Sequence, residues 1–221
     1  MSTTTALVTG ASRGIGAAIA EHLKLVGWDV LTPSRSELDL ENVDSIQAYV
    51  STLPEVYGLV LCAGINEPRL MSDVDDHTWQ RIQDTNATSA FRLITALAPR
   101  MAAESGGRIV AVSSAYSERA RAGRAAYSAS KAALEALIRS TALEFAPSGV
   151  LANAVAPGFV DTELTRTNND TATIATLLER VPIGRLADPQ EIAATVGFLL
   201  SPSNSYITGQ TIAVDGGWSI T

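Results

Sequence analysis

A tyrosine and a lysine stand four positions apart in the pentapeptide "YSASK", which spans residues 127–131. Four residues make about one turn of an α-helix, so Tyr127 and Lys131 project from the same side. The phenol of a free tyrosine has a pKa of about 10, which makes it a weak base near pH 7. A positive charge about 4 Å away is worth roughly 4 kcal/mol at an effective dielectric constant of 20, enough to lower that pKa by up to about 3. The spacing therefore fits either general acid–base catalysis on an alcohol or carbonyl, or a structural contact on a helix surface.

Two serines could complete such a site. The apolar run "RIVAVSS" (108–114) ends in Ser113 and Ser114, the second of which lies thirteen positions before Tyr127. Active sites of doubly wound sheets lie outside the carboxyl ends of the strands. A hydroxyl at that place could donate a hydrogen bond to a substrate oxygen and stabilise the charge that develops there.

Apolar runs typical of buried strands alternate with helix-length segments, and this alternation predicts an α/β fold with a doubly wound parallel sheet. The runs are 6–9, 29–33, 58–63, 108–114, 150–155 and 211–214. The helical segments are 14–27, 42–52, about 75–103, 125–146 and 189–200.

A glycine-rich turn follows the first apolar run directly. In "TGASRGIG" (9–16), the glycines are Gly10, Gly14 and Gly16, and a helical segment follows. A turn between strand and helix lets backbone amides and the helix N-terminus approach a pyrophosphate. Because the spacing differs from the general G-x-G-x-x-G fingerprint, tight packing alone is the competing interpretation.

Composition sets limits on the class of protein. The chain has 221 residues, 46% of them hydrophobic, and a formal net charge of −7, with no linker or repeat, so we expect one domain over residues 1–221. The acidic balance argues against nucleic acid as a partner, and the apolar runs are too short for a membrane span. Cys62 is the only cysteine, and His22 and His77 lack ligand-spaced partners, so no disulfide and no metal site is expected. The N-terminus does not resemble a signal peptide, and we expect a cytoplasmic protein.

The combination of "TGASRGIG" and "YSASK" resembles the short-chain dehydrogenase/reductase family, and further matches follow in the family's order. "LCAG" (61–64) resembles the family's N-A-G segment with Cys62 in place of asparagine, and "NAVAPGFVDT" (153–162) and "YITGQTIAVDGG" (206–217) also match. The resemblance covers almost the whole chain. "VPIGRLADPQEIA" resembles the 3-oxoacyl-thioester reductase branch, although many sugar and alcohol dehydrogenases share it.

The resemblance implies a set of catalytic and cofactor-binding residues. Tyr127 is expected to act as general acid/base beside Lys131, and the family's serine spacing selects Ser114 over Ser113. Asn86, in "TNATSAF", is expected to hold a water that relays protons to Lys131, or else to kink or cap a helix. Thr162 is expected to bond the nicotinamide carboxamide, and it could also cap a helix. The expected cofactor contacts are Gly10, Ser12, Arg13, Gly14, Ile15, Gly16, Ser34, Arg35, Asp39, Leu40, Ala63, Gly64, Tyr127, Lys131, Pro157, Gly158, Val160 and Thr162.

The residues after the second apolar run predict which nicotinamide cofactor binds. Ser34 occupies the place where NAD-preferring family members carry aspartate, Arg35 follows it, and Arg13 lies in the glycine turn. Two cations and no acid favour a 2′-phosphate, because guanidinium makes charge-assisted hydrogen bonds to phosphate. We therefore predict NADP(H), with two solvated surface arginines as the alternative.

The chain departs from the family between the second strand and "LDL" (38–40). The family has a helix and a third strand there, whereas this chain has only "SE". A parallel crossover needs a dozen residues or more, so that helix and strand cannot fit. We expect a sheet of six strands, in the family's terms 2-1-4-5-6-7, with Asp39 and Leu40 near the adenine.

The helix predicted at 125–146 has two apolar stripes and a polar side. The stripe suited to face the sheet is Tyr127, Leu134, Leu137, Ile138, Thr141 and Phe145; the second is Ala129, Ala133, Ala136, Ser140 and Leu143; the polar side holds Lys131, Glu135 and Arg139. We interpret the second stripe as a subunit interface of a homo-oligomer, a tetramer or a dimer. The alternative is a helix buried within its own domain.

Two segments bear on the substrate. Residues 163–187 correspond to the lid of family members, and the loop before the catalytic tyrosine carries Arg119, Arg121 and Arg124. These arginines favour an anionic substrate or carrier, unless they simply form a solvated charged loop. The leading hypothesis is an NADP(H)-dependent enzyme that reduces a small carbonyl compound, with a 3-oxoacyl thioester as one candidate, or that oxidises the alcohol in the reverse direction. The alternatives are a sugar or polyol dehydrogenase, a sugar-nucleotide epimerase or dehydratase, and a non-catalytic NADP-binding sensor.

Overall fold

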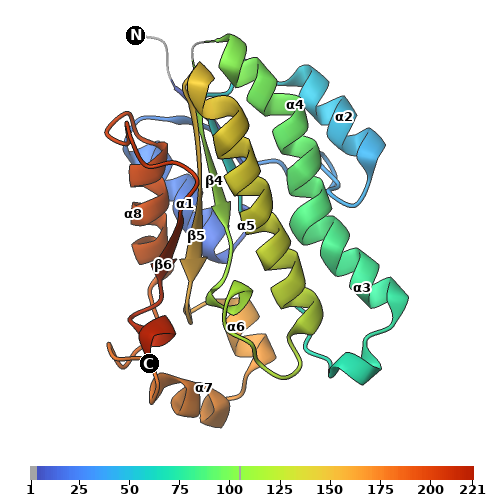
Figure 1. Cartoon of the computed structure of the whole chain (residues 1–221), viewed down its shortest axis with the longest axis vertical. Helices are drawn as coiled ribbons and strands as arrows, with labels where there is room; N and C mark the ends of the chain where they lie inside the picture. The colour runs from blue at the N-terminus through green and yellow to red at the C-terminus, as the bar shows by residue number, and fades with distance from the viewer. Residues whose placement is uncertain (1–3, 105) are drawn as a thin grey trace.

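A single parallel sheet runs through the protein. The computed structural model describes residues 4–104 and 106–221. Six strands pair in the order β2-β1-β3-β4-β5-β6, all of them parallel (Figure 1). Their bounds are β1 Thr5–Val8, β2 Asp29–Leu31, β3 Gly58–Leu61, β4 Gly107–Val112, β5 Val150–Pro157 and β6 Thr211–Val214. The predicted α/β class, strand number and strand order are therefore confirmed.

Helices cover both faces of this sheet. One face carries α1 (Gly14–Leu25) and α8 (Pro189–Leu200), and the other carries α2 (Val43–Thr52), α4 (Ser89–Ala103) and α5 (Ala125–Phe145), as Figure 1 shows. The long helix predicted at about 75–103 is α3 (Asp76–Gln83), a π-helical turn (Asp84–Thr88) and α4. Two short helices, α6 (Glu163–Asn168) and α7 (Thr171–Leu178), lie beyond the carboxyl ends of the strands.

Alternate residues of each central strand face opposite helical layers. In β1, Leu7 packs with the core under α2, α4 and α5, whereas Val8 packs with the core under α1 and α8. In β3, Leu59 and Val60 divide in the same way. Because both faces are covered, each of these side chains is fully buried, which explains the continuous apolar runs.

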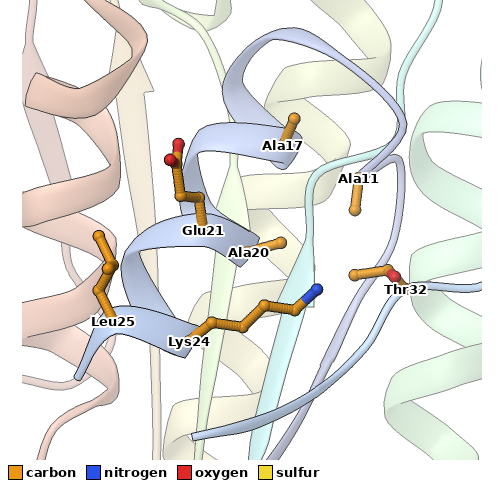
Figure 2. Close-up of a pocket in the computed structure, with 7 residues that line it drawn as sticks. All are labelled: Ala11, Ala17, Ala20, Glu21, Lys24, Leu25 and Thr32. Carbon is orange, nitrogen blue, oxygen red and sulfur yellow. The ribbon is translucent and has the colours of Figure 1, made fainter. Parts of the chain in front are cut away.

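The shortened connection after β2 leaves one flank of α1 uncovered. The chain runs from Leu31 to the start of α2 at Val43, and Asn42 caps that helix by accepting hydrogen bonds from the amides of Asp44 (2.8 Å) and Ser45 (3.2 Å). β2 is the edge strand, and a groove of about 430 Å³ lies between it and α1. Figure 2 shows the residues lining this groove: Ala11, Ala17, Ala20, Glu21, Lys24, Leu25 and Thr32.

The predicted sides of α5 differ in burial. Leu134 and Ile138 are buried against the sheet, as expected. Two members of the polar side, Lys131 and Glu135, are not solvated, since they are only 3% and 4% exposed. Both side chains instead find polar partners at the end of β4, described below. Arg139 is exposed.

The second stripe of α5 is exposed along its whole length, so burial of that stripe within the same domain is excluded. The exposed side chains are Ala129, Ala133, Ala136, Ser140 and Leu143.

Over the residues that the structure describes, no helix combines the length and hydropathy that crossing a membrane would require.

Candidate active site

A cavity of about 420 Å³ lies at the carboxyl edge of the sheet. Its walls come from the glycine turn, the loops that follow β2, β3, β4 and β5, and the first turn of α6. Every residue predicted to contact the cofactor lines it, and so does Ser114. Asn86 is the exception among the predicted site residues, since it lies behind the wall.

The glycine turn forms a cradle that side chains would fill. Gly10 has a φ of +69°, and a Cβ built on it would lie 2.7 Å from Cα of Ala63. A Cβ on Gly16 would lie 2.3 Å from the carbonyl oxygen of Gly10. Side chains at these two positions would collide with the protein's own backbone, so the glycines let the turn pack closely. The turn lines the cavity between a strand and a helix, the position at which such turns bind the pyrophosphate of a dinucleotide.

Thr9 ties the first and third strands together beneath this cradle. Its Oγ1 donates to the carbonyl of Val60 (3.2 Å) and accepts from the amides of Cys62 (3.1 Å) and Ala63 (3.2 Å). No role was predicted for Thr9, although it belongs to the motif "TGASRGIG". Its partners are more than fifty residues away, so spacing alone carried no signal.

The end of the cavity predicted to hold the 2′-phosphate contains acids as well as arginines. Arg13 forms an ion pair with Glu163 (2.7 Å), and Arg35 forms one with Glu41 (3.1 Å). In addition, Oε2 of Glu37 accepts hydrogen bonds from both the amide (2.8 Å) and the hydroxyl (2.7 Å) of Ser34. The prediction that no acid lies here is therefore wrong.

Ser114, Tyr127 and Lys131 meet at the opposite end of the cavity. The side chain of Ser114 lies close enough to the phenol of Tyr127 to act on its pKa, and its Oγ accepts from the amide of Tyr116 (3.2 Å). Ser113 also lines the cavity, but its hydroxyl is already engaged, because it donates to Glu135 (2.6 Å). The strand end thus presents Ser114, the serine that the family pattern selected, to the phenol.

Lys131 is a buried cation. Its Nζ donates to the carbonyl of Val112 (2.8 Å) and lies 5.8 Å from the centre of the Tyr127 ring. Burial lowers the pKa of Lys131 to about 8, while nearby Cys62 and Glu135 act in the opposite direction. The ammonium is therefore still the main form near pH 7, and it faces the cavity rather than bulk solvent.

The phenol of Tyr127 departs from the expectation of a lowered pKa. Burial raises the pKa of Tyr127, and the hydrogen bond from Ser114 and the charge of Arg124 only partly oppose this. The phenolate loses more hydration than the neighbouring charges restore. The expectation that Lys131 brings this pKa towards 7 is therefore wrong for the protein by itself.

Asn86 holds the loop that follows β3. It lies in the π-helical turn, where its Oδ1 accepts from the amide of Ile65 (2.8 Å). Its Nδ2 donates to the Ile65 carbonyl (2.9 Å) and to Oγ of Ser130 (2.9 Å). A Cβ on Gly64 would lie 3.3 Å from Nζ of Lys131 and 3.4 Å from Oδ1 of Asn86, so both side chains lie beside Gly64. The predicted water between them stays a prediction.

Thr162 occupies the junction between β5 and the predicted lid. Its Oγ1 accepts from the amide of Thr165 (3.2 Å) as the N-cap of α6, which is the capping alternative of the sequence analysis. The same residue lines the cavity, and its methyl would lie 3.4 Å from a Cβ on Gly14. Capping therefore leaves Thr162 facing the cofactor cradle.

An aromatic cluster lies next to the short helix (Ala115–Ser117) that follows Ser114. The rings of Tyr116, Phe159 and Trp218 pack edge to face, with centroids 5.5–6.1 Å apart. Arg121 donates to the hydroxyl of Tyr116 (3.0 Å) and to Oδ1 of Asn169 (3.3 Å). This loop therefore joins the predicted lid to the aromatic cluster.

The parallel sheet with a glycine cradle at its carboxyl edge, and a serine, a tyrosine and a lysine across the cavity, defines a nicotinamide-dependent oxidoreductase of Rossmann type. Residues 36–219 match the family model described as enoyl-(acyl carrier protein) reductase. The 3-oxoacyl-(acyl-carrier-protein) reductase FabG of Vibrio cholerae is 42% identical over 96% of both chains.

Solved structures agree with this comparison. A protein from Agrobacterium tumefaciens, provisionally described as a gluconate dehydrogenase, superimposes with a TM-score of 0.94 at 34% identity, covering 99% of this chain and 96% of the other. A protein from Beutenbergia cavernae, provisionally described as an NAD(P)-dependent gluconate 5-dehydrogenase with bound NADP at low occupancy, gives 0.91 at 32%, covering 100% and 98%. The chain belongs to the short-chain dehydrogenase/reductase family, in the branch of the FabG-like reductases. It is an enzyme that transfers hydride between a nicotinamide dinucleotide and a carbonyl or alcohol.

Proposed function

We propose that this enzyme reduces a small ketone to a secondary alcohol with NADPH, or catalyses the reverse reaction, and that Tyr127 is its general acid/base. The observation that carries the proposal is the convergence of Ser114, Tyr127 and Lys131 on one cavity whose other end is the glycine cradle. The bound dinucleotide supplies the hydride.

Four residues of this chain have proposed roles in proton transfer, charge stabilisation and positioning. Tyr127 donates its phenolic proton to the substrate oxygen, and its raised pKa keeps that proton in place at neutral pH. Ser114 donates a hydrogen bond to the same oxygen as negative charge builds on it. The ammonium of Lys131 stabilises the tyrosinate that forms and binds the cofactor ribose. Asn86 positions the loop beside Lys131, and the predicted water relay passes through this region.

The proposal of NADP(H) rests on Arg13 and Arg35, which flank the place of the 2′-phosphate. Their ion pairs are exposed, and exposed pairs contribute little, so either guanidinium can exchange a carboxylate for a phosphate. A doubly charged phosphate is also the stronger partner for guanidinium. The carboxylate of Glu37, which accepts a hydrogen bond from the amide of Ser34, instead favours NAD(H), because a carboxylate at this place can bind the ribose 2′-OH.

The substrate proposal follows from the branch of the family. We propose an anionic or polar carbonyl compound, with a 3-oxoacyl thioester and a keto sugar acid as the two candidates. The name of FabG states that it reduces a 3-oxoacyl group on the acyl carrier protein, which is the first candidate. The two similar structures are described as gluconate dehydrogenases, which supports the second. Residues 163–187, which include α6 and α7, form the proposed lid over this substrate within the single proposed domain, 1–221.

A ketone panel tests the enzyme assignment directly. NADPH consumption is measured for wild type and for Tyr127→Phe, with NADH in parallel. Turnover by wild type that the variant lacks supports the proposal. A non-catalytic sensor would bind NADPH without turnover, and an epimerase would convert a sugar nucleotide without net consumption of added cofactor.

We also propose a homo-oligomer, either a tetramer or a dimer, built on the second stripe of α5. Leu143 of this stripe is 83% exposed, and Phe91 on the neighbouring helix α4 is 50% exposed. Light scattering would show an oligomer for wild type and a smaller species for Leu143→Glu. A wild-type monomer would contradict the proposal.

The cytoplasmic location stays a prediction that cell fractionation can test.

A further inference from the structure

The three arginines of the loop before Tyr127 have different surroundings. Arg119 is exposed and donates to the carbonyl of Ser219. Arg121 is half-buried and bonded to Tyr116 and Asn169. Arg124 is only 5% exposed, and its NH1 is buried without a hydrogen-bond partner. Among the described residues, no carboxylate lies within ion-pair distance of Arg124.

A buried cation without a partner is costly to maintain. Removing a guanidinium from water is unfavourable unless an anion and hydrogen bonds replace the lost hydration. Burial accordingly lowers the pKa of Arg124, and the neighbouring charge of Arg121 lowers it further. Packing alone does not account for a guanidinium here, since an apolar or amide side chain of similar length would avoid this cost.

Arg124 is also close to the reacting groups. It is the N-cap residue of α5, one turn before Tyr127, and its charge acts on the phenols of both Tyr116 and Tyr127. Tyr116 belongs to the aromatic cluster, where Nε1 of Trp218 is a second buried donor without a partner. Two buried donors without partners, one on Arg124 and one on Trp218, therefore lie near Tyr116, close to the catalytic tyrosine.

We propose that Arg124 binds a carboxylate of the substrate that lies within a few bonds of the reacting carbonyl. The preferred substrate class is then a small keto acid, or the corresponding hydroxy acid in the reverse direction. A thioester on a carrier protein fits less well, because its charged groups lie at the far end of a long arm while its carbonyl region is neutral. Gluconate, named for two of the similar structures, carries a carboxylate of this kind.

This inference rests on the proposed function, and a pair of matched substrates separates the two. Acetoacetate and methyl acetoacetate differ only in the negative charge, so wild type should prefer the acid in kcat/KM. Arg124→Gln should reduce kcat/KM for the acid about 10- to 100-fold, the range for a hydrogen bond to a charged group, and change the ester by less than about 3-fold. Arg124→Lys should recover part of the loss.

Arg119→Gln is the matched control, since it removes an exposed arginine of the same loop and should leave both substrates unaffected. An equal loss of acid and ester activity in Arg124→Gln would overturn the proposal, because it would mean that Arg124 acts only through Tyr127 or the fold. A wild type that prefers the ester would overturn it as well.

A binding measurement covers the remaining outcomes. Butyrate and butyramide are inert analogues, and the NADP-loaded wild type should be stabilised against heat more by the acid than by the amide. Arg124→Gln, or Arg124→Lys if the first variant does not fold, should reduce that difference. If wild type turns over no ketone yet shows this charge-dependent binding, the proposed function fails while Arg124 keeps its assigned ligand. Turnover without any charge-dependent binding rejects only the role of Arg124.

Discussion

The two ends of the cavity hold their positive charges in opposite ways. At the end proposed to bind the 2′-phosphate, the side chains of Arg13 and Arg35 are 68% and 76% exposed, and each is paired with a glutamate. At the reaction end, Lys131 lines the cavity and is bonded to a backbone carbonyl, and Arg124 lies one turn before Tyr127 at the start of α5; both are buried. Arg13 and Arg35 can exchange their glutamates for another anion with little loss of free energy. Lys131 and Arg124 remain charged only at a large desolvation cost.

This difference separates binding from proton chemistry. Exposed arginines are screened by water and ions, so they can select a cofactor without taking part in the proton chemistry at the other end. A buried ammonium has a shifted pKa and therefore takes part in proton chemistry near neutral pH. Lys131, with a pKa of about 8, is such a group. Changes at the reaction end should therefore alter rates strongly, and changes at the phosphate end should alter cofactor preference more moderately.

Replacing the phenol should have the largest effect. Tyr127→Phe removes the proposed proton donor and keeps the ring, so kcat/KM for ketone reduction should fall about 10³-fold or more. NADPH binding, followed by its fluorescence, should change less than about 3-fold. A variant that retains a tenth of wild-type activity would show that another group supplies the proton.

The pH profile should report Lys131. Its pKa of about 8 means that the ammonium loses its proton above that pH, while Tyr127, whose pKa is raised, keeps the proton that reduction requires. The value of kcat/KM for reduction should therefore decline above about pH 8, by up to about tenfold per pH unit. In Lys131→Met this limb should disappear along with most of the activity. A wild-type profile that is flat to pH 9.5 would contradict this assignment.

Cofactor preference should respond to single charges at the other end. Arg35→Ala should raise the KM for NADPH about 5- to 20-fold and leave NADH nearly unchanged, because only the phosphate loses a charge-assisted hydrogen bond. Glu37→Gln should shift preference further towards NADPH, since it removes the acid that Ser34 holds. Steady-state kinetics with both cofactors measures this, and equal effects on NADH and NADPH would argue against NADP(H) as the physiological cofactor.

The exposed ion pair should contribute least. In a double-mutant cycle of Arg13→Ala and Glu163→Ala, the coupling free energy of unfolding should be below about 1 kcal/mol and should weaken as salt is added. A coupling several times larger would mean that the phosphate end also holds its charges rigidly, and the contrast between the two ends would fail.

Local spacing determined much of the architecture. The alternation of apolar runs with helical segments predicted the parallel sheet, and the two residues before Leu38 excluded a further helix and strand. The four-residue spacing of Tyr127 and Lys131 placed both on the cavity side of α5. These features depend on residues near one another in the chain, where periodicity and chain length are reliable guides.

Burial and charge pairing were decided by tertiary structure. Arg13 pairs with a glutamate 150 positions away, and Glu135 receives its hydrogen bond from a strand end 22 positions before it. The local pattern grouped Lys131 and Glu135 with the exposed Arg139, and it treated Arg124 like Arg119. Which of these charged side chains is buried, and so loses its hydration, depends on how the sheet and loops pack together. Because hydration dominates the pKa of a phenol or an ammonium, the direction of the shift at Tyr127 could not be obtained from spacing alone.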